Sequence, residues 1–67
     1  MSVSSVSSVS AASPVSFKDA LEKGYARASQ TLRGIESIEI VGERAKVEAG
    51  VIKEYIVDLK IVFALEK

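Results

Sequence analysis

The 67-residue sequence contains no cysteine, no histidine and no tryptophan, and only one proline. Without cysteine the chain forms no disulfide, and without cysteine and histidine together it lacks the usual ligands of a zinc site. A chain of this length buries only about 60% of its unfolded surface, and small domains are usually stabilised by disulfides, metals or further subunits. Because 48% of the residues are apolar, self-association is the remaining route to a stable fold.

The sequence has no excess of positive or negative charge: nine basic and nine acidic side chains give a formal net charge of zero. General binders of nucleic acid or of anionic membranes need a basic surplus, so neither is expected as a partner. No apolar run approaches the roughly 18–20 residues of a membrane-spanning helix, and the N-terminus lacks the features of a signal peptide. We therefore expect a cytoplasmic protein.

Without histidine or cysteine, the chain has few side chains suited to general acid–base catalysis, and we do not expect an enzyme.

The first 17 residues carry no charged side chain, and Ser-Val-Ser occurs three times between Ser2 and Ser10. Valine at every third position fits neither the strand period of two nor the helix period of 3.6. Taken alone, the segment is typical of a flexible Ser-rich tail. The competing interpretation is a weak edge strand, because valine is β-branched.

A helix is predicted over residues 16–33. Pro14 breaks regular structure, Ser16 can cap the free amides, and Asp19 makes a variant of the capping box. Gly24 indicates close packing against a sheet, and Gly34 occupies the position of a C-terminal cap. An apolar stripe with helical spacing supports the prediction and consists of Phe17, Ala20, Leu21, Gly24, Tyr25, Ala28 and Leu32.

After this helix the period changes to two, which predicts strands over 36–48 and 51–66 joined by an Ala49-Gly50 turn. Alternate residues of the last strand form a wholly apolar face that we expect to meet the helix: Tyr55, Val57, Leu59, Ile61, Phe63 and Leu65. The other face is mixed and suits a second, partly buried surface. Its Asp58 and Lys60 are interpreted as members of an intersubunit ion pair rather than as catalytic groups.

One helix on a two-stranded hairpin is a thin domain. A third strand therefore has to come from residues 2–11 or from another chain. This geometry again favours assembly.

The segment ARASQTLRGI at residues 26–35 resembles the helix end of the dodecins, a family of small flavin-binding proteins. Residues 53–66 resemble the last strand of that family, and residues 13–17 resemble the stretch before its helix. The resemblance implies an α+β fold in a single domain over 1–67. Its order is β-α-β-β, with residues 1–12 as a weak first strand and a three-stranded antiparallel sheet partly wrapped around one helix. It also implies a hollow homododecamer that binds and stores flavin (riboflavin, FMN or FAD) without catalysis.

Flavins in that family stack between tryptophan side chains at the start of the second strand, and a glutamine on the third strand hydrogen-bonds the ring. The matching positions here are Ser37 and Ile56. Arg44 matches a position where some relatives carry a basic residue that faces a ligand phosphate, although a solvated strand charge explains it as well. Ser37 offers no ring face, Ile56 offers no donor or acceptor, and stacking contributes about 0.5–1.5 kcal/mol per aromatic pair. We therefore predict a flavin site of weak or lost affinity at these three positions.

Two alternatives remain open. The same shell could serve without flavin, as a compartment or as a binder of another ligand. Calcium accepts carboxylates from several subunits at a symmetry axis, some dodecin-like proteins bind calcium instead of flavin, and one strand here carries Glu36, Glu39, Glu43 and Glu48. The neighbouring Arg44, Lys46 and Lys53 favour a solvated charged surface over a metal site.

Overall fold

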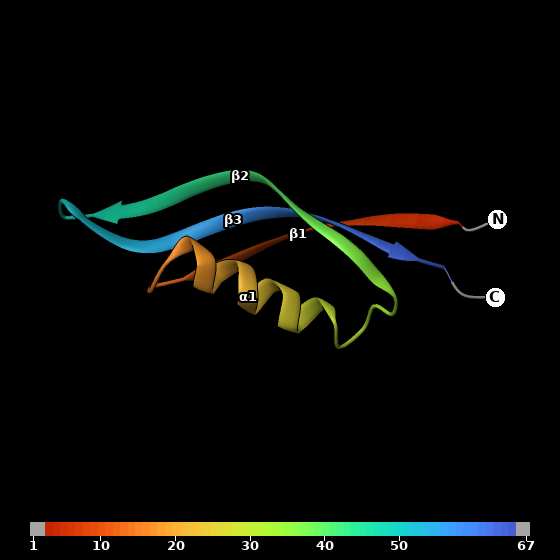
Figure 1. The fold of residues 1–67 in the computed structure, drawn as a ribbon. Helices are drawn as coiled ribbons and strands as arrows, with labels where there is room; N and C mark the ends of the chain where they lie inside the picture. Colours follow the sequence, from red (N-terminus) through yellow and green to blue (C-terminus); the bar gives the residue numbers. More distant parts are fainter. Residues whose placement is uncertain (1–2, 66–67) are drawn as a thin grey trace.

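The computed structural model describes residues 3–65, which form three strands and one helix (Figure 1). In chain order these are β1 (Ser4–Ser13), α1 (Phe17–Ala28), β2 (Ile35–Glu48) and β3 (Val51–Ala64). β3 is the central strand, and β1 and β2 pair with it antiparallel on its two sides. The predicted β-α-β-β order and the three-stranded antiparallel sheet are therefore confirmed.

The Ser-rich segment forms the strand β1 rather than a tail. Its ten residues pair with β3 from Ser4, opposite Ala64, to Ser13, opposite Tyr55. Because valine recurs every three residues while strand faces alternate every two, Val9 packs against the core and Val6 is 53% exposed on the opposite face. The strand therefore depends on its backbone pairing with β3 more than on apolar burial. The predicted strand ends at residues 1, 2 and 66 lie outside the described residues.

The core is small and lies between α1 and the middle of β3. As predicted, alternate residues of β3 turn toward the helix, which buries Val57, Leu59 and Ile61. Two helix residues, Ala20 and Ala28, complete the buried apolar set. So few large buried side chains give the subunit little apolar stabilisation of its own.

The two ends of the predicted apolar face of β3 behave differently. Tyr55 is half-buried and packs edge-on against Phe17, with ring centroids 5.0 Å apart and an interplanar angle of 74°. This aromatic pair closes the core at the start of α1. Leu65 was predicted on the same face, but it is 50% exposed: β3 ends at Ala64, although the Leu65 amide still donates to the Val3 carbonyl at 2.9 Å.

The start of α1 is fixed by serine and aspartate side chains. The Ser16 hydroxyl caps the helix by accepting a hydrogen bond of 2.9 Å from the Asp19 amide. The Asp19 carboxylate accepts from the Ser13 hydroxyl at 2.5 Å and from the Lys23 ammonium at 2.9 Å. Ser13 is fully buried and also accepts from the Val15 amide. Asp19 thereby ties the end of β1 to the first turn of the helix.

The prediction that the helix continues to residue 33 is wrong, because α1 ends at Ala28. The Ala28 carbonyl accepts from the amides of both Thr31 (3.1 Å) and Leu32 (2.8 Å), in a turn that leaves the helical path. This turn lets Leu32 pack against the core. Gly34 does not cap the helix but has a φ of +67°, and its carbonyl accepts from the Ala64 amide at the entry to β2.

The hairpin of β2 and β3 projects beyond the helix (Figure 1). Its turn has positive φ at Ala49 (51°) and at Gly50 (74°), as a type I′ turn requires. The Cα radius of gyration is 13.8 Å, whereas a compact chain of this length has about 11 Å. The subunit is therefore elongated. Among residues 3–65, no helix has the length and apolar character needed to cross a membrane.

Gly24 allows α1 to lie close to the sheet. A Cβ atom at this position would be 2.7 Å from Leu59 Cδ1 and 3.1 Å from Ala11 Cβ. Gly24→Ala gains about 1 kcal/mol of helix propensity but overpacks a buried contact, which costs about 1–3 kcal/mol. We expect a net decrease in the free energy of unfolding, measured by urea denaturation. A variant more stable than the wild type, as propensity alone implies, would contradict the close packing. Ala26→Gly at an exposed helix position measures the propensity effect separately.

The contacts of Asp19 predict a specific acid sensitivity. The Ser13 hydroxyl, followed by the Lys23 ammonium, lowers the pKa of Asp19 below its ordinary value of 3.8. A carboxylate with a lower pKa in the folded state stabilises the fold above its unfolded pKa, and this stabilisation is lost as pH falls through the folded pKa. We expect the melting temperature of Asp19→Asn to fall less steeply than that of the wild type below about pH 4. Glu22→Gln, at an exposed helix position, should keep the wild-type slope; equal slopes for all three proteins would refute this role.

Candidate functional site

The face of the sheet opposite α1, here called the outer face, carries all three predicted site residues. β3 residues that alternate with Val57, Leu59 and Ile61 point to this face, and their register partners on β1 and β2 lie beside them. The central part of the outer face includes Val6, Ser8, Ser10 and Ala12 of β1, Ile56, Asp58, Lys60 and Val62 of β3, and Ser37, Glu39, Gly42 and Arg44 of β2.

The structure brings two of the predicted residues together and separates the third. Arg44 lies directly opposite Ile56 in the β2–β3 register, whereas Ser37 lies opposite Val62. Val62 is six residues from Ile56 along β3, which corresponds to about 20 Å at about 3.3 Å per residue. A flavin ring in contact with Ser37 is therefore too far from Ile56 of the same subunit. It can contact Ile56 only if that residue belongs to a second subunit.

Asp58 is the polar centre of the outer face. Its Oδ1 accepts from the Ser10 hydroxyl of β1 at 2.6 Å and from the Arg44 guanidinium of β2 at 3.4 Å. Gly42 lies directly opposite on β2, where a Cβ atom would be 3.0 Å from Asp58 Oδ2. The carboxylate thus joins all three strands. Sequence reasoning missed this cluster, because only the register of β1 and β2 on β3 brings its members together.

The link between Asp58 and Arg44 is the weaker of the two. Both side chains are at least one-third exposed, at 36% and 54%. Exposed ion pairs contribute about 0–1 kcal/mol, so the guanidinium remains open to a competing anion. Asp58 is engaged within its own subunit, and an intersubunit ion pair of the outer face stays a prediction for Lys60.

The outer face does not fit a stacked flavin. The chain has four aromatic side chains, and none lies on this face. Tyr55 and Phe63 alternate onto the helix side of β3, Phe17 packs against Tyr55, and Tyr25 is on α1. Ser37 is exposed and supplies no ring. Ile56 supplies no hydrogen bond to a ring edge, so this face offers no aromatic ring for stacking and no hydrogen-bonding group at position 56.

The glutamates considered for calcium do not converge within the subunit. Glu39 lies opposite Lys60 in the register, and the Glu48 carboxylate is 3.5 Å from the Lys46 ammonium. Glu36 accepts from the Ser4 hydroxyl at 3.2 Å. Across residues 3–65, no three acidic side chains gather in a way that could hold a metal ion. Within one subunit these carboxylates are dispersed along β2.

Comparisons with known proteins agree with this architecture. The Dodecin family model matches residues 3–66. The dodecin from Streptomyces davaonensis is 30% identical, with 98% of this chain and 97% of that chain covered at a TM-score of 0.94. The dodecin from Streptomyces coelicolor is 33% identical, with 98% and 94% covered at a TM-score of 0.94. No curated protein matches the chain.

A more distant structure has the same fold. The calcium dodecin from Mycobacterium tuberculosis, described as a calcium-chelating antigen with a novel calcium-binding site, is 23% identical. Its alignment covers 96% of this chain and 91% of that chain at a TM-score of 0.84. At this identity the similarity concerns the fold alone.

The hydrogen bond between Ser10 and Asp58 should anchor β1 to the sheet. Ser10→Ala removes one donor to a carboxylate, and we expect the free energy of unfolding to fall by about 1 kcal/mol. Ser8→Ala is the matched control, because Ser8 is also exposed on the outer face of β1 but has no side-chain hydrogen bond to residues 3–65. Urea denaturation of both variants measures the difference. Equal effects would show that the Ser10 bond does not hold the strand.

Proposed function

Because the chain belongs to the dodecin family, we propose that it is the subunit of a homododecameric shell that binds a small ligand and does not catalyse a reaction. We further propose that the affinity for flavin (riboflavin, FMN or FAD) is weak or lost in this member. The observation that carries this proposal is the outer face, which bears none of the four aromatic side chains. A flat ring has nothing to stack on there, and stacking contributes about 0.5–1.5 kcal/mol per aromatic pair.

The shape of the subunit supports assembly. Among residues 3–65 the buried apolar core has five members, whereas the β2–β3 hairpin extends past α1 (Figure 1). Exposed apolar side chains on an extended hairpin favour contact with other chains, and a chain this short is marginal alone. The apolar residues left between 39% and 59% exposed on the hairpin strands are Ile40, Val41, Val47, Val51 and Ile52. Further copies of the chain would cover them.

The polar groups of the outer face favour a ligand that forms hydrogen bonds. Ser8 and Ser10 supply hydroxyls, Lys60 and Arg44 supply cations, and Asp58 supplies a carboxylate. The Asp58 carboxylate is engaged by Ser10 and Arg44, so it is poorly placed as a general base. This arrangement supports binding rather than catalysis.

Restoring the missing groups should restore flavin binding. We expect the wild-type protein to quench little riboflavin fluorescence at tens of micromolar protein. The double variant Ser37→Trp with Ile56→Gln supplies a stacking ring and an amide, and its riboflavin affinity should rise by at least about tenfold, since about 1.4 kcal/mol corresponds to that factor. Fluorescence titration at fixed riboflavin measures both affinities.

The titration needs two controls. Ser37→Leu with Ile56→Gln adds apolar surface without a ring and should not reproduce the gain. Light scattering should give about 86 kDa, twelve times the 7.2 kDa of one chain. Tight riboflavin binding by the wild type would overturn the proposed loss of flavin affinity. A mass of 7.2 kDa would instead overturn the shell.

A further inference from the structure

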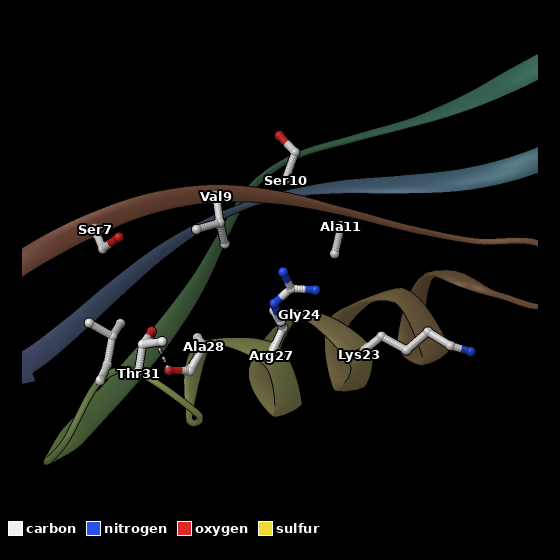
Figure 2. A pocket seen from close by; sticks show the side chains of 10 residues that line it. Ser7, Val9, Ser10, Ala11, Lys23, Gly24, Arg27, Ala28 and Thr31 are labelled. Carbon is white, nitrogen blue, oxygen red and sulfur yellow. Dashed lines mark hydrogen bonds between the residues drawn. The ribbon is translucent and has the colours of Figure 1, made fainter.

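A cleft of about 320 Å³ lies between α1 and β1, on the opposite side of the sheet from the outer face. Figure 2 shows the side chains around it, with Val9 and Ala11 on the strand and Ala28 and Arg27 on the helix. Leu32, in the turn after the helix, also lines the cleft. This cleft uses none of the residues discussed for flavin.

The cleft exists because both of its walls carry small side chains. On the helix, Gly24 and Ala28 are buried, and Val9 and Ala11 on the strand are half-buried. These apolar side chains are short and leave space between the walls, which the longer side chains of Lys23 and Arg27 line. At about 30 Å³ per water molecule, the volume holds about ten water-sized groups.

The charge around the cleft is of one sign. Its lining includes Lys23 and Arg27 and no carboxylate, although the whole chain has as many acidic as basic residues. The two cations are four residues apart, so they lie on the same side of α1. Lys23 is partly neutralised by Asp19 at 2.9 Å, whereas Arg27 makes no ion pair with any of residues 3–65. In Figure 2 the Arg27 guanidinium lies between the helix and β1.

The C-terminus of α1 repels a bound anion only weakly. A helix C-terminus carries partial negative charge on its free carbonyls. Here the Ala28 carbonyl is covered by the Thr31 amide (3.1 Å), the Leu32 amide (2.8 Å) and the Thr31 hydroxyl (3.4 Å). The positive charge of Arg27 therefore dominates the mouth of the cleft.

We propose that this cleft binds a small amphiphilic carboxylate, with an apolar body of about six to eight carbons against Val9, Ala11, Ala28 and Leu32. Arg27 binds the carboxylate, and Lys23 adds positive charge beside it. Charge complementarity selects this occupant, because an apolar floor under two cations matches an apolar chain with one anionic end. The site is independent of the proposed loss of flavin binding.

The test is isothermal titration calorimetry of the assembled protein with octanoate. Octanoate should bind at least about tenfold more tightly than octanol and than inorganic phosphate, because only octanoate has both the apolar body and the anion. Arg27→Gln should weaken octanoate binding by at least about tenfold. Arg33→Gln makes the same charge change at an exposed position outside the cleft and should leave it unchanged.

Three results would overturn the proposal. These are no heat of octanoate binding to the assembled protein, equal affinity for octanoate and phosphate, and equal effects of Arg27→Gln and Arg33→Gln. Arg27 is exposed, so its replacement should leave the fold intact, which circular dichroism checks. The comparison of octanoate with octanol on the wild type does not depend on any variant.

Discussion

The close approach of α1 to β3 at Gly24 is the contact on which the rest of the subunit depends. Leu59 of the central strand fills the space that a side chain at position 24 would occupy. Because β3 lies between the other two strands, the position of the helix on β3 also fixes its position over β1. The small residues that permit this approach leave the cleft beside β1, so one packing requirement creates both the core and an open space next to it.

The two faces of the sheet differ in composition. The helix face holds the apolar core and three of the aromatic side chains, Phe17, Tyr55 and Phe63. The outer face carries hydroxyls and charges centred on Asp58. This distribution explains how a chain can keep the dodecin fold with a polar outer face, because the apolar core lies on the helix face and no core residue has to change with the chemistry of the outer face.

Much of the fold could be predicted from local patterns, and the failures have physical causes. Alternation along β3 identified its buried residues, since a strand face repeats every two residues. The helix end was misplaced because apolar spacing continues through Leu32, which reaches the core from a turn rather than from the helix. The separation of Ser37 from Ile56 depends on the register between β2 and β3, which cannot be read from the sequence alone. The Asp58 cluster and the cleft escaped sequence reasoning for the same reason, because tertiary pairing brings their residues together.

The contact between Gly42 and Asp58 has a consequence for how this sequence can vary. A side chain at position 42 would press on a carboxylate that Ser10 and Arg44 already hold in place. A Cβ atom at position 42 therefore requires the carboxylate at position 58 to shift slightly, while its other oxygen, Oδ1, is bonded to Ser10 and Arg44. The two positions constrain each other across the strand pair, and among variants of this chain they should change together rather than one at a time.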